Sequence, residues 1–82
     1  MARKPTLRNR RHLAMQRVLR ATRVERGYKQ RELSEKLGRA SNYVTLIETG
    51  QRRCDIPEFF ELVEAIGADP VAVFTRIAQW SP

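Results

Sequence analysis

Four glycines divide this chain into segments that favour small helices. Gly27, Gly38, Gly50 and Gly67 separate stretches of 10 to 26 residues. Glycine lacks a Cβ and adopts positive φ without strain, so it commonly follows the last turn of a helix. Within the stretches, apolar residues recur at spacings of three and four, which is the period of an amphipathic helix. The sequence therefore predicts an all-α fold without strands.

The stretches between the glycines predict five helices. In chain order they cover about residues 9–26, 30–37, 40–49, 57–66 and 70–79. Pro57 and Pro70 fit the first turn of the last two helices, where the missing N–H costs nothing. The fourth helix carries a well-formed apolar stripe of Phe59, Leu62, Val63 and Ile66.

Length and charge limit what such a bundle can do. The 82 residues predict one domain, residues 9–80, preceded by a flexible basic arm, residues 1–8. The formal charge of +7 is uneven, because residues 1–26 carry +8, residues 27–53 carry +3 and residues 54–82 carry −4. Most of the positive side chains are arginines, whose planar guanidinium group suits phosphates and guanine edges. The asymmetry favours a polyanionic partner on one side of the molecule over an evenly solvated surface.

The remaining chemistry-bearing residues argue against several classes of function. Cys54 is the only cysteine and His12 the only histidine, so neither an internal disulfide nor a metal-ligand cluster is expected. No arrangement of residues resembles a catalytic site, so we expect no enzyme, no cofactor and no small-molecule ligand. No apolar run approaches the length of a membrane span, and because there is a single cysteine, a reducing interior such as the cytoplasm fits best. Cys54 is expected to be a small, at least half-buried apolar residue, with a redox-sensing thiol as the alternative.

Residues 30–37 and 40–49 have the layout of a helix-turn-helix. Gly38 fits the tight turn between them, and the small side chain of Ser34 allows the two helices to cross closely. Four aliphatic residues attach the pair to the core: Leu33, Leu37, Val44 and Ile47.

The outer face of the helix predicted over residues 40–49 is unusually free of long charged side chains. It carries Ser41, Asn42, Thr45, Leu46 and Thr49. Short polar side chains let a helix approach a DNA groove closely, and they can hydrogen-bond to base edges while an apolar group meets a thymine methyl. An ordinary solvent-facing helix is the alternative, but serine, asparagine and threonine are poor helix formers there.

The segments LRATRVERGYKQRELSEKLG, NYVTLIETG and FFELVEAIGADPVAVF resemble the Cro/C1-type (XRE) helix-turn-helix family of phage and bacterial regulators, over about residues 15–78. The resemblance implies a five-helix, lambda-repressor-like domain whose third helix enters the major groove, usually as a homodimer on a two-fold operator. It also implies that Arg23 and Glu48 form a structural ion pair between the first and third helices.

The resemblance also assigns the DNA-contacting positions. The base-facing residues are Ser41, Asn42, Thr45 and Leu46. The expected phosphate contacts are Lys29, Gln30, Arg39, Tyr43, Thr49, Arg52 and Arg53, of which Gln30 matches the phosphate-clamping glutamine of the family.

The chain departs from the family pattern at a few positions. Ser34 stands where alanine is usual, which we expect to be a harmless exchange. Lys29 replaces a serine or threonine N-cap, which weakens the second helix and adds a phosphate contact. Because Arg39 and Ala40 replace the usual cap, Ser41 either caps the third helix or contacts a base. Leu46 stands where a polar residue is frequent.

The two ends of the chain suggest further contacts. In the basic arm, Arg3 and Lys4, with Arg8, Arg10 and Arg11, either enter a minor groove or track the DNA backbone; a solubilising tail is the alternative. The last helix is expected to form a homodimer interface rather than leave its apolar residues exposed on a monomer. The interface residues are Val73, Phe74, Ile77 and Trp80.

These observations favour a small sequence-specific regulator that binds double-stranded DNA at a palindromic operator. A repressor or autoregulator of the phage, restriction–modification controller or antitoxin type fits best. The alternative is a protein-interaction module that kept the fold without DNA recognition; acidic residues at the base-facing positions would favour it, but the residues there are small and neutral.

Overall fold

The computed structural model describes residues 9–81, and all regular structure in this range is helical. The elements are α1 (Arg10–Glu25), α2 (Gln30–Lys36), α3 (Tyr43–Glu48), α4 (Ile56–Ile66) and α5 (Pro70–Gln79). The predicted all-α fold with five helices is confirmed. No helix in the described range combines the length and apolar character needed to cross a membrane.

Helices α4 and α5 begin where their prolines and acidic residues predict. Asp55 Oδ1 accepts a hydrogen bond from Glu58 N at 2.8 Å, and Glu58 Oε1 accepts one from Asp55 N at 3.1 Å. This reciprocal capping box satisfies two backbone amides that have no partner within the helix. Asp69 Oδ1 accepts from Val71 N at 3.0 Å and caps α5 through this contact.

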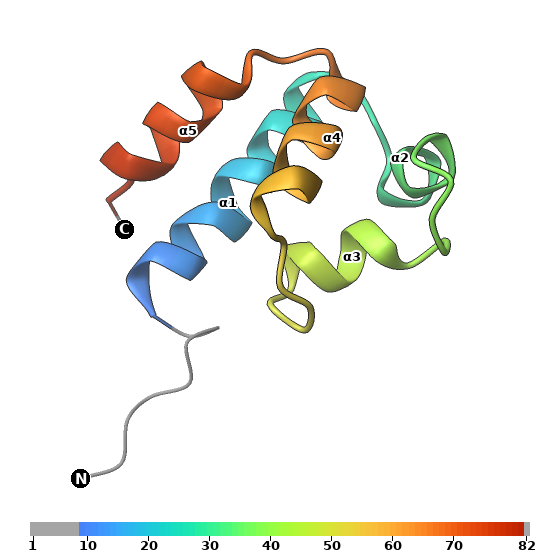
Figure 1. The fold of residues 1–82 in the computed structure, drawn as a ribbon, viewed down its shortest axis with the longest axis horizontal. Helices are drawn as coiled ribbons and strands as arrows, with labels where there is room; N and C mark the ends of the chain where they lie inside the picture. Colours follow the sequence, from blue (N-terminus) through green and yellow to red (C-terminus); the bar gives the residue numbers. More distant parts are fainter. Residues whose placement is uncertain (1–8, 82) are drawn as a thin grey trace, which may run out of the picture.

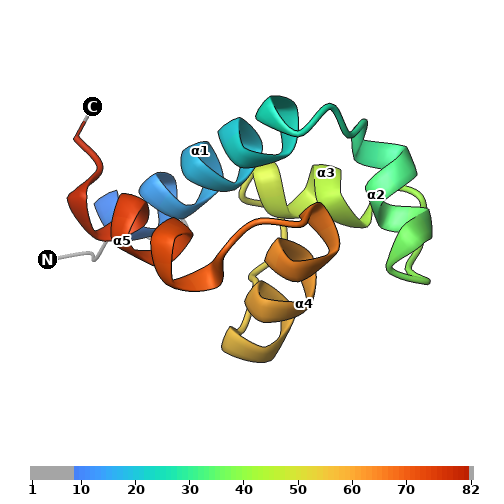
Figure 2. The ribbon, with the colours of Figure 1, turned by 90° about the horizontal axis from the view of Figure 1, so that it is seen from above.

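The long helix α1 organises the bundle. Figure 1 shows α5 beside α1 at one end of the molecule and α2 with α3 at the other. Figure 2 shows that α1 and α4 lie on opposite sides. The start of α1 meets the end of α5, where Arg11 Nη1 donates to Ala78 O at 3.2 Å. The buried apolar core between the helices consists of Ala14, Val18, Leu19, Leu33, Tyr43, Val44, Ile47, Phe59, Leu62, Val63, Ile66 and Val73.

Helix α3 is shorter than predicted. It begins at Tyr43 rather than near Ala40, because Ser41 and Asn42 form a turn that Tyr43 N closes by donating to Ala40 O at 2.9 Å. Both residues are exposed and precede the helix. Two of the four expected base-facing side chains therefore project from a turn at the start of α3.

Candidate nucleic-acid interface

The turn between α2 and α3 brings the two helices into close contact through Ser34. Its side chain is completely buried, and its Oγ donates to Gln30 O at 2.9 Å and accepts from Val44 N at 3.0 Å. Ser34 therefore caps α3 from the neighbouring helix, and the N-cap position of α3 is Asn42, so the capping alternative for Ser41 is not observed. The exchange of alanine for Ser34 also adds a buried hydrogen bond that the sequence did not predict. Gly38, with φ of 69°, provides the left-handed residue that the turn requires.

A buried polar network fixes α3 against α1 and α2. Arg23 Nε and Nη2 donate to the two oxygens of Glu48 at 2.7 and 3.0 Å. Gln30 Nε2 donates to Glu48 Oε1 at 2.8 Å, and Thr45 Oγ1 donates to Gln30 Oε1 at 2.8 Å. The Arg23–Glu48 pair predicted from the family resemblance is thus present. Gln30 is more constrained than expected, because Glu48 and Thr45 already bond its amide group.

Short polar side chains lie in the turn before α3 and along α3 itself. Ser41 and Asn42 are exposed, whereas Thr45 and Leu46 are half-buried. Thr49 is exposed, but its hydroxyl donates to Thr45 O at 2.7 Å, so its proton is already used. The four expected base-facing residues therefore lie in the turn before α3 and in α3 itself, and Ser41 and Asn42 are the most accessible of them.

Tyr43 departs from its predicted role. Its side chain belongs to the core and the residue is only 5% exposed, so it does not present an open surface to a phosphate. The guanidinium groups of Arg39 and Arg52 lie over its ring, 4.9 and 4.8 Å from the centroid. Sequence reasoning missed this role because tyrosine is amphipathic and occurs both in cores and at interfaces.

Carboxylates of α4 hold two of the expected phosphate-contacting arginines. Arg52 Nη1 and Nη2 donate to the two oxygens of Glu58 at 2.9 and 2.8 Å. Arg39 lies 3.3 Å from Glu61 and 3.9 Å from Glu58. The hydrogen bonds from Arg52 lower the pKa of the Glu58 carboxyl to about 2. In the free protein these two arginines therefore belong to a charge network with α4, and their contact with phosphates stays a prediction.

The remaining expected phosphate contacts lie on both sides of the helix-turn-helix. Lys29 and Arg53 are exposed at the start of α2 and in the loop after α3. Lys29 occupies the N-cap position of α2 without a cap hydrogen bond from its side chain, but Glu32 Oε1 accepts from Lys29 N at 3.2 Å, so the start of α2 keeps one capping contact. Arg3 and Lys4 lie outside the described residues. Arg10 and Arg11 belong to α1 and not to an arm.

Two arginines of α1 lie beside this surface, although the sequence pattern did not mark them as site residues. Arg17 and Arg20 line a pocket with Gln30 and Thr49. The signal that could have identified them is spacing, because Arg17 and Arg20 are three residues apart, as are Arg20 and Arg23, and residues at this spacing are neighbours on a helix surface.

The single cysteine has the character of a structural residue. Cys54 is partly buried, and burial, with the nearby carboxylates of Glu58 and Asp55, raises the pKa of its thiol to about 12. A thiol reacts through its thiolate form, so this environment opposes the redox-sensing alternative.

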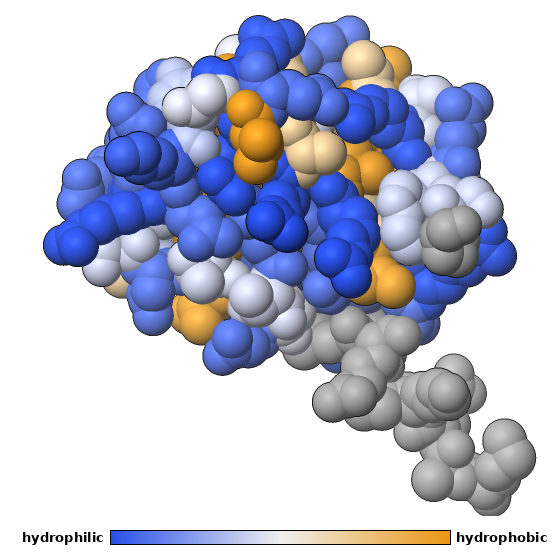
Figure 3. Space-filling model, turned by 180° about the vertical axis from the view of Figure 1, so that it is seen from behind, coloured by the Kyte–Doolittle hydropathy of each residue, from blue (hydrophilic) through white to orange (hydrophobic). Residues whose placement is uncertain are grey.

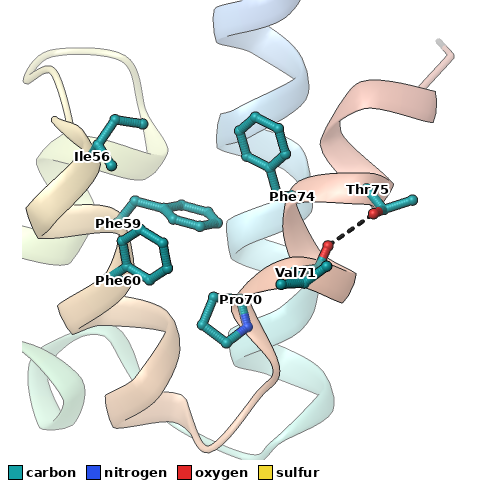
Figure 4. A pocket seen from close by; sticks show the side chains of 7 residues that line it. All are labelled: Ile56, Phe59, Phe60, Pro70, Val71, Phe74 and Thr75. Atoms are coloured by element: carbon teal, nitrogen blue, oxygen red, sulfur yellow. Dashed lines mark hydrogen bonds between the residues drawn. The ribbon is translucent and has the colours of Figure 1, made fainter.

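The apolar surface of α5 differs from the predicted dimer interface. Val73 is buried in the core and 3% exposed, and Ile77 and Trp80 pack against that core. The exposed apolar residues lie instead between α4 and α5, where Figure 4 shows their side chains around a groove. This apolar patch consists of Ile56, Phe60, Val71 and Phe74.

Helix α3, braced by α1 and α2 and carrying short polar side chains at its exposed start, defines a helix-turn-helix DNA-binding domain. The family model described as "Helix-turn-helix domain" matches residues 14–73. The chain belongs to the XRE-type helix-turn-helix regulators, which are DNA-binding proteins of transcription regulation.

Solved structures support this assignment. The chain is similar to an XRE-family like protein from Pseudomonas syringae pv. tomato str. DC3000, with 33% identity, a TM-score of 0.79 and coverage of 88% of each chain. It is also similar to the clp gene regulator ClgR from C. glutamicum, with 26% identity, a TM-score of 0.75 and coverage of 93% of this chain and 94% of that one. A comparison with curated proteins gives no match.

Proposed function

We propose that this protein binds a specific sequence of double-stranded DNA and acts as a small repressor or autoregulator, with α3 in the major groove. The exposed pair Ser41 and Asn42 at the start of α3 carries the proposal. The buried Arg23–Glu48 and Ser34–Val44 contacts hold this segment rigidly, and rigid placement is what base recognition needs. Asparagine pairs with adenine through two hydrogen bonds, and serine bonds to either kind of base.

Phosphate contacts orient the domain on the duplex. Lys29 and Arg53 are exposed cations on either side of the helix-turn-helix. Arg39 and Arg52 can exchange the carboxylates of α4 for phosphates when DNA arrives, because both side chains remain more than one third exposed. Such contacts raise affinity for every sequence and carry no base information.

A homodimer on a palindromic operator fits the apolar patch of α4 and α5. Val71 is 71% exposed, Ile56 60% and Phe74 57%, which is a large apolar surface for a domain of this size. A second copy related by a two-fold axis would cover the patch and place two α3 helices on successive half-sites. Of the four interface residues expected from the sequence, the proposed interface keeps Phe74 and leaves out Val73, Ile77 and Trp80, which belong to the core or pack against it. It adds Ile56, Phe60 and Val71. Such a regulator would act in a bacterial or phage-infected cytoplasm.

The proposal is tested by measuring how tightly protein variants bind a selected operator and versions of it with single base pairs changed. Asn42→Ala should cost about 1–3 kcal/mol of binding free energy and relax discrimination at one base pair per half-site. Arg53→Ala should weaken binding to all sequences alike. If Asn42→Ala left the preference for every base pair unchanged, α3 would not be the element that recognises sequence.

A further inference from the structure

A polar pocket of about 380 Å³ opens between α1, α2 and α3. Its lining residues are Gln16, Arg17, Arg20, Gln30, Glu48 and Thr49. Gln30 begins α2 and Thr49 follows the last residue of α3, so the pocket borders the helix-turn-helix directly. Helix α1 supplies half of this lining, and neither of its two arginines here is among the DNA contacts expected from the sequence.

The negative charge in the pocket is already balanced. Both oxygens of Glu48 accept hydrogen bonds from Arg23, and Gln30 adds a third. The Glu48 side chain is only 3% exposed and that of Arg23 9%, so the pair acts as a neutral unit at the pocket floor. Thr49 donates its proton to Thr45 O and bounds the pocket without offering a donor.

The positive charge in the pocket is not balanced. Arg17 and Arg20 are exposed, and neither guanidinium group has a hydrogen bond or ion pair within residues 9–81. Other arginines nearby are engaged, as Arg23 and Arg26 show with Glu48 and Gly67 O. The surface on the α1 side, opposite the view of Figure 1, is mostly hydrophilic (Figure 3). Two unpaired arginines three residues apart thus face an open polar pocket.

We infer that Arg17 and Arg20, together with the Gln30 amide, form a phosphate-binding pocket that seats the DNA backbone flanking the groove that α3 occupies. The inference rests on the proposed DNA-binding function. Guanidinium groups bind phosphate oxygens through two parallel N–H donors, and the amide of Gln30 keeps a second proton that Glu48 does not use. The pocket anchors α1 to the duplex and adds no base discrimination.

Salt-dependent binding of a selected operator and of its scrambled counterpart tests the pocket. The test variant is Arg17→Gln with Arg20→Gln, and its fold should persist because both side chains are exposed and unpaired. The charge-matched control is Arg26→Gln with Arg76→Gln, since Arg26 contacts Gly67 O and Arg76 contacts Glu25, away from the pocket. Thermal melting monitored by circular dichroism verifies the fold of both variants.

Each phosphate contact contributes about 0.9 to the slope of log affinity against log salt. The test variant should therefore lose about 1.8 from that slope, so that wild-type affinity falls roughly tenfold more than the variant's over a fourfold rise in salt. The ratio of operator to scrambled affinity should stay unchanged, and the control should keep the wild-type slope. Equal slopes for the test variant, the control and the wild type would overturn the pocket while leaving specific DNA binding intact.

Ethylation of single operator phosphates provides a second test, because it shows which individual phosphates the protein contacts. In the wild type, ethylation of the phosphates seated in the pocket should block binding, and in the test variant, which keeps only the Gln30 amide of the three groups, it should interfere much less. An identical interference pattern in both proteins would overturn the inference. If the wild type bound neither duplex at any salt concentration, the proposed function would fail, and the pocket would fail with it.

Discussion

Arg23 of α1 holds Glu48 of α3 through two hydrogen bonds of 2.7 and 3.0 Å, and the two side chains are only 9% and 3% exposed. The pair joins the first and third helices across 25 positions of sequence. Gln30 and Thr45 extend it toward the surface of α3. The orientation of the DNA-facing segment thus depends on a buried charge pair.

Removal of one member of this pair should unfold the domain more readily. Arg23→Met leaves the Glu48 carboxylate buried without its charge partner, although Gln30 still donates to it, and should lower the free energy of unfolding by about 3–5 kcal/mol. The double variant Arg23→Met with Glu48→Met removes both charges and should recover most of that loss. Urea denaturation of the three proteins measures both values. Equal losses in the single and double variants would show that packing rather than charge is responsible.

Ser34 and Ser41 should respond very differently to the same substitution. Ser34→Ala leaves Val44 N without its acceptor in a buried position and should cost about 1–2 kcal/mol of unfolding free energy. Ser41→Ala changes an exposed side chain before the helix and should stay within about 0.5 kcal/mol. Thermal melts of the two variants compare them directly. A larger loss from Ser41→Ala would restore Ser41 as the cap of α3.

The Arg52–Glu58 contact should make stability depend on pH. Folding lowers the pKa of Glu58 from 4.5 to about 2, so its stabilising effect is present above about pH 5 and is lost as pH falls toward 2. Glu58→Gln should therefore be less stable by about 1 kcal/mol near neutral pH, a modest value because Arg52 is partly exposed. The two proteins should converge near pH 2. A stability difference that stayed constant across this range would contradict the ion pair.

The apolar patch should control the oligomeric state. Phe74→Glu places a charge within the patch and should convert a dimer into a monomer. Val24→Glu is a matched control, since Val24 and Phe74 are both 57% exposed but Val24 lies on α1, outside the groove. Sedimentation equilibrium of the wild type and both variants measures the change. A wild type that sediments as a monomer would show that there is no such interface. Dimers in all three proteins would show that the interface lies elsewhere.

Local signals in the sequence were sufficient for most of the fold. In each of the last two helices an aspartate occupies the N-cap and a proline lies in the first turn. Both signals act within three residues, so α4 and α5 begin where predicted. The glycines end helices for equally local reasons. The Arg23–Glu48 pair, by contrast, was predicted from the family resemblance rather than from any local pattern.

The features that could not be predicted depend on contacts between distant segments. The cap of α3 comes from Ser34, ten residues before Val44, and no local rule identifies it. Glu58 reaches Arg52 only because α4 packs beside the loop after α3, so the sequence alone presents Arg52 as a free cation. On α5, the periodicity places Val73 among apolar neighbours but does not reveal which side faces the core.

Recognition of a specific DNA sequence by this chain is tested most directly by equilibrium binding. A duplex selected from a random library is compared with a scrambled duplex of equal length. We predict that the selected site is palindromic and is bound at least about a thousandfold more tightly than the scrambled one at physiological salt. Equal and steeply salt-dependent binding to both duplexes would contradict the account and indicate a non-specific basic binder. No binding to either duplex would contradict it as well and favour a protein-interaction module.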